Sequence, residues 1–358
     1  MRASGILLPV SSLPGKYGIG SFSEEAYKFV DFLKDSKQQY WQILPIGPTS
    51  YGDSPYQSFS TYAGNPYFIS LEELIEQGLL TEKECDKVDF GDKIDKVDYE
   101  KLYNGRFKLL KKAYKRSNIR EREEFKKFKD ENQYWLNDYA MFMAIKERFK
   151  GQSFDNWAED IKLRWGYSME YYQNELKEEI EFYEFVQYEF YRQWYKLKKY
   201  ANDNGVKIIG DIPIYVAYDS ADVWAHPELF QMDENGKPVA VAGCPPDGFS
   251  ATGQLWGNPL YKWDYHKQTN YDWWIKRIER SVQLYDVVRI DHFRGFDEYY
   301  SIPARDEDAT NGHWEKGPGI DLFNAIKYIS ICPRNLRIHI LIINCLNLYT
   351  LSIYLLTF

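Results

Sequence analysis

Short apolar runs that end in a carboxylate restrict the fold of this chain more than any other feature. Residues 206–210 lead into Asp211, and residues 287–290 lead into Asp291. A segment of helical type, residues 273–284, precedes the second run. Strands that alternate with helices predict a parallel sheet, and the carboxyl ends of such strands carry the catalytic residues of barrel enzymes. We therefore expect an α/β fold with its chemistry at these two strand ends.

Two more strands are predicted near the start of the chain, at residues 5–10 and 40–46, where short apolar runs are bounded by Gly, Pro and Ser. Between them, residues 26–33 have helical spacing, and Ser21 with Glu24 predicts a capping box before that helix. Residues 47–67 are too rich in Gly, Pro and Ser for regular structure. The first seventy residues are thus predicted to form two βα units and a long polar and aromatic loop.

From residue 71 to 200 the pattern changes to a helical one. Lys and Glu alternate with Tyr and Phe, and glycine is sparse. Apolar residues over 176–201 recur at steps of three and four, and residues 202–205, Asn-Asp-Asn-Gly, predict a C-cap. This stretch is interpreted as a helical insertion whose last helix returns the chain to the sheet.

Composition excludes several classes of protein. The 358 residues, 44% hydrophobic and 27% charged, suit a globular chain, and the net charge of -8 argues against nucleic acid as a main partner. Four scattered cysteines without a CxxC pair suggest neither a disulfide framework nor a zinc site, and they favour reduced thiols in the cytoplasm. Aromatic residues reach 18%. Their rings suit the faces of sugars, although Tyr is also common in cores.

Asp291 is the strongest catalytic candidate, because strand alternation puts Arg289 on its side, where the guanidinium can hold the carboxylate ionised. A charged carboxylate at a strand end is what a glycosidic nucleophile requires. The alternative is an Arg–Asp ion pair that only fixes the strand end. For Asp211 the alternative is a turn capped by its side chain, and Asp53, in an aromatic loop, is a weaker candidate.

Other motifs narrow the chemistry further. Residues 241–250 and 254–261 are read as one polar and aromatic loop, either a stacking platform or a rigid surface loop with its rings turned inward. His226 and His313 have no companions at metal-ligand spacing. The chain contains no GxGxxG, GxxxxGK[ST] or GxSxG motif.

Five long blocks, taken together, are more specific than any single residue. In chain order they read SGILLPVSSLPGKYGIGSF, LPIGPTSYGDSPYQSFSTYAGNPY, GDIPIYVAYDSADVW, AGCPPDGFSATGQLWGNPLY and VVRIDHFRGF. This series closely resembles the amylomaltase family of 4-α-glucanotransferases, from about Ala3 to about Ile326.

The resemblance implies a fold, an activity and a set of site residues. The fold is a (β/α)8 TIM barrel with helical insertions, and no metal or organic cofactor is needed. The activity is transfer of α-1,4-glucan segments between maltooligosaccharides by a retaining double displacement. In the RIDHFRG block the nucleophile matches Asp291, with Arg289 and His292 beside it. The positions that match substrate-binding residues are Tyr56, Ser58, Asp211, Asp247, Trp256 and Asn258.

The resemblance ends after residue 326, where the chain turns into Ile, Leu, Asn and Tyr, with no Asp or Glu after Asp321. The family's general-acid Glu, in an Ala-Glu-Asp-Leu-Gly block, has no match here. We expect only the N-terminal half of the barrel, an unpaired edge at residues 287–290, and no measurable disproportionation of maltotriose by the chain as written, because the general acid is absent. A frameshift is favoured over a membrane tail, because residues 338–358 are uncharged but contain His339 and several Asn, Thr and Ser.

The predicted organisation therefore has four segments. Residues 1–70 form the first βα units with a substrate loop, and 71–200 the helical insertion. Residues 201–326 carry further barrel strands, the nucleophile and a second substrate loop, and 327–358 form the tail. The alternatives to a transferase are a glucan-binding remnant without catalysis, a non-functional truncated product, and an amylase-like hydrolase. The oligomeric state stays open.

Overall fold

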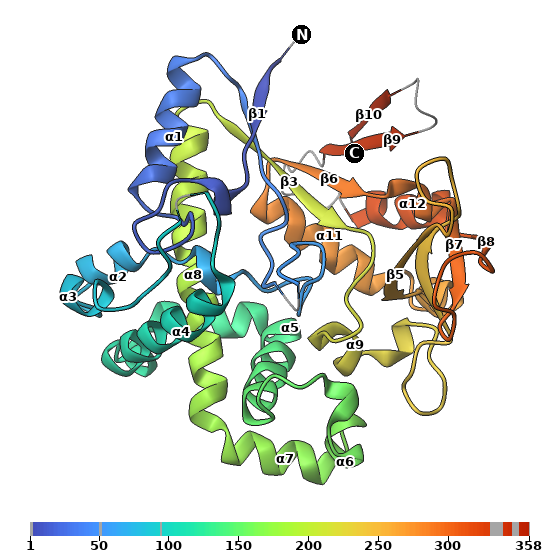
Figure 1. Ribbon diagram of the computed structural model, residues 1–358, viewed down its shortest axis with the longest axis horizontal. Coiled ribbons are helices and arrows are strands. Elements are labelled where there is room, and N and C mark those ends of the chain that lie inside the picture. The colour runs from blue at the N-terminus through green and yellow to red at the C-terminus, as the bar shows by residue number, and fades with distance from the viewer. Residues whose placement is uncertain (1–2, 50–51, 94, 330–338, 346–350, 358) are drawn as a thin grey trace. The chain divides into compact units, whose positions relative to one another are not determined.

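The computed structural model describes residues 3–49, 52–93, 95–329, 339–345 and 351–357 (Figure 1). The chain forms two compact units, each taken by itself below. The first contains Met1–Pro55, Ala63–Gly151 and Gly166–Ile209, and the second contains Tyr56–Tyr62, Gln152–Trp165 and Gly210–Phe358. These units interleave along the chain, so they do not test the predicted division into four consecutive segments, which stays a prediction.

The first unit contains a parallel arrangement of short strands. β1 (Gly5–Leu7) pairs with β2 (Tyr40–Gln42), which pairs with the start of β3 (Lys207–Pro213), and both pairings are parallel. The strands predicted at 5–10 and 40–46 are confirmed in place but are shorter than predicted. Pro9 and Pro45 follow soon after the observed ends, and proline has no N–H to donate to a neighbouring strand.

The first helix, α1 (Glu24–Asp35), corrects the predicted capping box. Its N-cap is Ser23, whose side chain makes no capping hydrogen bond. Ser21 lies two residues before the N-cap and is buried, so it cannot cap the first turn. A capping box is present instead at α3 (Glu82–Cys85), between Thr81 and Glu84.

Residues 71–200 are mainly helical, and the last helix of this stretch is the one that the periodicity predicted. α8 (Lys177–Asp203) buries an aromatic stripe that includes Phe182, Phe185 and Trp194, and Gly205 follows with φ +79°. α5 (Glu123–Arg148) and α4 (Tyr99–Arg116) pack against it. The remaining helices of the first unit are α2 (Leu71–Glu76), α7 (Gly166–Glu175) and the 3₁₀ helices η1 (Val10–Ser12), η2 (Pro66–Phe68) and η3 (Ile119–Glu121).

The second unit contains the end of β3 and three further strands of the six-stranded sheet. Beyond β3 the strand order is β6 (Val287–Asp291), β9 (His339–Cys345) and β10 (Leu351–Thr357). β6 pairs in parallel with β9, with Val288 opposite Ile340, so the unpaired edge expected at residues 287–290 is wrong. β9 and β10 are antiparallel strands of the tail. In the described residues no helix is long and apolar enough to cross a membrane.

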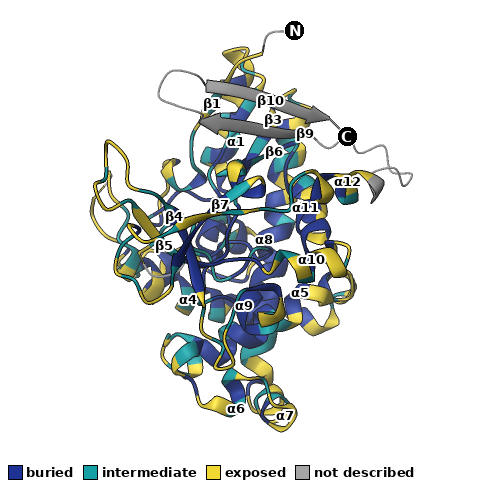
Figure 2. Cartoon of the chain, turned by 90° about the vertical axis from the view of Figure 1, so that its right-hand side faces the viewer, coloured by how far each residue is buried: buried dark blue, intermediate teal, exposed yellow. Residues whose placement is uncertain are grey.

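Helices precede and follow these strands. α11 (Asp272–Leu284) leads into β6 and confirms the helix predicted at 273–284. It contains both buried and exposed residues (Figure 2), and Trp274 and Ile278 are among the buried ones. The other helices of this unit are α6 (Glu159–Lys162), α9 (Ala221–Ala225), α10 (Trp263–Gln268), α12 (Ile320–Ile329) and the 3₁₀ helices η4 (Phe154–Asn156), η5 (Pro227–Leu229) and η6 (Phe293–Phe296).

A second sheet was not predicted. It is antiparallel, with the order β5 (Gln254–Pro259), β4 (Ala240–Cys244), β7 (Glu298–Pro303) and β8 (His313–Lys316). Residues 241–250 and 254–261 were read as loop, and the structure corrects this, because β4 and β5 lie at either end of a true loop. Val241, Tyr300 and Ile302 of this sheet form a buried cluster with Ala309. Such tertiary packing overrides the low strand propensity of Gly and Pro.

Candidate active site

The candidate site lies in the second unit, where β3 and β6 are neighbours (Figure 1). Arg289, on β6, joins a carboxylate from each strand. Its Nη1 donates to Asp211 Oδ2 at 2.5 Å, and its Nη2 donates to Asp291 Oδ1 at 2.5 Å. Two charge-assisted hydrogen bonds from one planar guanidinium fix both carboxylates relative to each other. The predicted pairing of Arg289 with Asp291 is confirmed, and Asp211 shares the same guanidinium.

Asp211 is the closed member of this pair. Its side chain is 1% exposed, and Oδ2 also accepts a hydrogen bond from the Tyr56 hydroxyl at 2.8 Å. Oδ1 is buried and has no partner within the described part of the chain. Burial raises the pKa of this carboxyl above its usual range, and the neighbouring Arg289 and Tyr56 oppose that rise.

Asp291 is the open member. Its side chain is 40% exposed, and the hydrogen bonds recorded for it among the described residues come from Arg289. The carboxylate is therefore held through Oδ1, while the side chain stays partly exposed. This arrangement leaves an oxygen free to approach a ligand, as a nucleophile must.

His292 follows Asp291 in a left-handed backbone conformation, with φ +51°. Its ring packs edge-on to Trp256, with centroids 4.9 Å apart, and lies near Tyr215 at 6.3 Å. Nε2 is buried without a hydrogen-bond partner in the described residues. Burial lowers the pKa of His292, Asp291 opposes this and Arg294 adds to it, so the imidazole is neutral near neutral pH.

Hydrogen bonds to α9 fix the loop that carries Tyr56. Asp222, a buried residue of that helix, accepts hydrogen bonds from Thr61 N at 2.9 Å and Thr61 Oγ1 at 2.6 Å. Ala221 N donates to Phe59 O at 2.8 Å. These contacts fix the loop whose tyrosine reaches Asp211.

The two predicted residues of β5 have different surroundings. The Trp256 ring lies against His292, the residue that follows Asp291. Asn258 is buried, donates to Val216 O at 2.8 Å and accepts from Gln57 Nε2 at 3.1 Å. Its amide ties β5 to the segment after β3, so the structure gives Asn258 a supporting position.

Ser58 and Asp247 are not hydrogen-bonded to the carboxylate pair. Ser58 Oγ donates to Ser60 O at 2.8 Å within its own loop. Asp247 is exposed and accepts from Phe249 N and Ser250 N, both at 2.8 Å, which closes a turn in the loop between β4 and β5. Their substrate-binding roles stay predictions.

Sequence reasoning missed several residues that shape the site. Gln57, Tyr215 and Asp222 all lie inside blocks that carried the family resemblance. Buried polar residues beside turn residues are a general signal of positioning contacts, because a buried polar group needs a partner. Asp222 fits that signal, whereas nothing local marks Tyr215.

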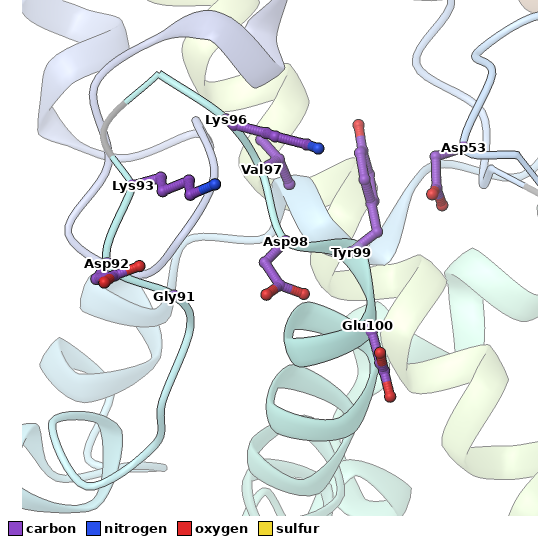
Figure 3. Close-up of a pocket in the computed structure, with 9 residues that line it drawn as sticks. All are labelled: Asp53, Gly91, Asp92, Lys93, Lys96, Val97, Asp98, Tyr99 and Glu100. Atoms are coloured by element: carbon purple, nitrogen blue, oxygen red, sulfur yellow. The ribbon is translucent and has the colours of Figure 1, made fainter.

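Asp53 belongs to the first unit, where it lines a pocket of about 410 Å³ (Figure 3). Burial raises the pKa of its carboxyl. The other lining residues are Gly91, Asp92, Lys93, Lys96, Val97, Asp98, Tyr99 and Glu100. Across the described residues, no group of three or more His, Cys, Asp or Glu side chains is placed to hold a metal ion.

Comparisons with known proteins identify the family of this chain. Residues 8–334 match the family described as 4-alpha-glucanotransferase. The chain is 53% identical to the 4-alpha-glucanotransferase of Clostridium butyricum over 319 residues, which is 89% of this chain and 66% of that protein. It is also 53% identical to the enzyme of Streptococcus pneumoniae strain TIGR4 over 328 residues, 91% of this chain and 65% of that protein. The chain thus spans about two thirds of the length of these relatives.

Solved structures give the fold. The amylomaltase from Streptococcus agalactiae in complex with acarbose matches with a TM-score of 0.92 and 44% identity, over 98% of this chain and 70% of that one. The amylomaltase from Corynebacterium glutamicum, 20% identical, matches with a TM-score of 0.72 over 90% of this chain and 45% of that one, and supports the fold alone. The α/β fold is that of a TIM-barrel enzyme with helical insertions, and the chain belongs to the 4-alpha-glucanotransferase family.

Proposed function

We propose that this chain supplies the nucleophile and a glucan-binding surface of a 4-α-glucanotransferase that acts on α-1,4-glucans. The observation that carries the proposal is the pair of unlike carboxylates on Arg289. Asp211 is buried and Asp291 is open, although both bind the same guanidinium. Retaining glycosidases need one carboxylate that is held ionised and free to approach the anomeric carbon.

In the proposed reaction, an oxygen of Asp291 attacks the anomeric carbon of the donor glucan. The bond from that carbon to the bridging oxygen breaks, and the leaving sugar keeps the electron pair and takes a proton from a general acid. The product is a β-glucosyl ester of Asp291. The 4-hydroxyl of an acceptor sugar then attacks the same carbon, loses its proton to a base and releases the carboxylate. We assign the proton donor to no residue of this chain.

The other residues act on position and solvent. Arg289 orients Asp291 and balances its charge, and Asp211 with Tyr56 fixes Arg289 from the buried side. The ring of Trp256, next to the neutral His292, offers an apolar face to a sugar and limits water beside the ester. Exclusion of water favours transfer to a sugar over hydrolysis.

The test uses α-maltotriosyl fluoride as the donor. Fluoride leaves without a proton, so attack by Asp291 is measured apart from the general acid. We expect the chain to release fluoride and to form a glycosyl ester on Asp291, detected by mass spectrometry after rapid denaturation. D291N abolishes both signals. The D264N variant, which removes an exposed carboxylate of α10, is the control and retains them.

Glucan binding is measured on the same samples by calorimetry with maltoheptaose. Binding without fluoride release would contradict the transferase proposal and leave a non-catalytic glucan-binding protein. Fluoride release that yields only free maltotriose, with no longer oligosaccharide when maltose is the acceptor, would identify a hydrolase. The cytoplasmic location and the absence of a nucleic-acid partner stay predictions from composition.

A further inference from the structure

A buried arginine outside the carboxylate pair forms hydrogen bonds to the main chain just after Asp211. Arg277, on α11, is 2% exposed, and the hydrogen bonds of its guanidinium among the described residues go to oxygens other than carboxylates. Burial raises the pKa of the nearby Asp222 carboxyl, and the charge of Arg277 is among the influences that oppose this rise. Its guanidinium lies over the ring faces of Trp273 and Trp274, at 5.4 and 4.8 Å from their centroids. A buried cation is costly unless hydrogen bonds and ring faces replace its water, so its partners define its role.

Those partners are main-chain carbonyls at the end of β3. Arg277 Nη2 donates to Pro213 O, and Nη1 donates to Ile214 O at 2.9 Å and to the Tyr261 hydroxyl at 3.2 Å. The Tyr261 hydroxyl donates in turn to Ile214 O at 2.8 Å. A rigid guanidinium fork therefore fixes two successive carbonyls, which a lysine ammonium cannot do with the same geometry.

These hydrogen bonds join α11, the helix before β6, to the end of β3, the strand that carries Asp211. Pro213 is two residues after Asp211, and α11 ends three residues before β6. The neighbouring carbonyl of Val216 is held by Asn258, so the segment 213–216 is fixed from two sides. Tyr215, between the held carbonyls, lies beside His292.

We propose that Arg277 is a positioning residue, which fixes the carboxyl end of β3 so that Asp211 stays bound to Arg289 and Arg289 keeps Asp291 oriented. The inference rests on the proposed function. Arg277 touches no reacting atom in this account. It acts through Pro213 and Ile214, and a small displacement of a catalytic group is enough to slow a reaction about a hundredfold.

The first arm of the test compares R277K and R277Q with the parent chain for fluoride release from α-maltotriosyl fluoride, well below the unfolding temperature of each variant. We expect the rate constant to fall by roughly tenfold in R277K and roughly a hundredfold in R277Q, with maltoheptaose affinity unchanged within twofold. K276Q removes an exposed cation of the same helix, paired with Asp272, and is the matched control. A purely structural role predicts lower thermal stability with an unchanged rate constant.

The second arm does not need activity. The imidazole of His292 is observed by NMR with ¹⁵N-histidine labelling and is assigned with H292Q. Because Tyr215 contacts this ring, we expect its resonances to shift in R277K, while those of the exposed His313 stay fixed. Unchanged His292 resonances together with a rate constant within twofold of the parent would overturn the inference. If the parent releases no fluoride, the proposed function fails, and the NMR arm alone decides the role of Arg277.

Discussion

The ends of β3 and β6 present the same chemical group in opposite environments. Asp211, on β3, is enclosed and receives hydrogen bonds from Tyr56 and Arg289. Asp291, on β6, is bound by Arg289 and otherwise opens outward. The difference shows how one guanidinium serves two purposes, because it neutralises a buried carboxylate and orients an accessible one. Through Arg289, the buried Asp211 therefore helps to fix the position of the exposed Asp291.

The largest effect is expected from substitution of Asp291, the exposed carboxylate. D291N keeps the size of the side chain but removes the charge and the nucleophilic oxygen. We expect fluoride release from α-maltotriosyl fluoride to fall by about a thousandfold or more, equivalent to about 4 kcal/mol, given what covalent catalysis contributes. Calorimetry should show unchanged binding of maltoheptaose. A rate within tenfold of the parent would mean that Asp291 is only a structural partner of Arg289.

Substitution of Asp211, the buried carboxylate, should have a smaller effect on the rate of fluoride release. D211N retains an oxygen that can accept from Tyr56 or Arg289, but it leaves the guanidinium with one charged partner. We expect the rate of fluoride release to fall by about a hundredfold, the cost of a misplaced catalytic group. The D264N control should leave the rate unchanged. A glycosyl ester found on Asp211 in the parent chain would show that Asp211 is itself the nucleophile.

How far the sequence predicted this site depends on the range of the interactions. Asp211, Arg289 and Asp291 were found from strand patterns, since alternation and strand ends are local properties. The hydrogen bonds of Arg277 to Pro213 and Ile214 join segments more than sixty residues apart, and no local sequence pattern indicates these contacts. The antiparallel sheet was missed partly for the same reason, because β4 pairs with β7 although β5, two α-helices and β6 lie between them in the chain.

The tail shows a different limit. The end of the family resemblance at residue 326 predicted half a barrel with β6 unpaired, yet the parallel register of Val288 with Ile340 gives that strand a neighbour. A run of apolar residues without Asp or Glu is compatible with a buried strand as well as with a membrane segment. The roles predicted for Ser58 and Asp247 came from the resemblance, and they stay predictions because the contacts recorded for them are local.

Protonation of the buried histidine His266 should lower the stability of the fold. His266, on α10, is buried, its Nε2 donates to Leu229 O at 3.1 Å, and its ring packs against Tyr261, which holds Ile214. Burial lowers the pKa of His266 to about 4. Because the folded pKa lies below the unfolded value of 6.5, the unfolded state binds more protons between these values, and stability falls as the pH drops through this window.

We expect the free energy of unfolding, measured with urea, to fall by about 2 kcal/mol from pH 7 to pH 5 through this residue. H266Q should be less stable at pH 7 but should lose less on acidification. H313Q, at an exposed histidine, is the control and should follow the parent. Equal pH slopes in the parent and H266Q would show that His266 is not buried in its neutral form.

The smallest effect is expected from the hydroxyl that closes the pair. Y56F removes the donor to Asp211 Oδ2 and keeps the ring. The loss of one hydrogen bond to a charged group should slow fluoride release by about tenfold, or about 1.4 kcal/mol. Since this hydroxyl lowers the pKa of Asp211, its removal raises that pKa further, and the acid limb of the pH–rate profile moves to higher pH. Y265F, on α10, is the matched control. A slower rate with an unmoved acid limb would show that Tyr56 acts on the sugar and not through Asp211, and the two strand ends would then be independent of this hydroxyl.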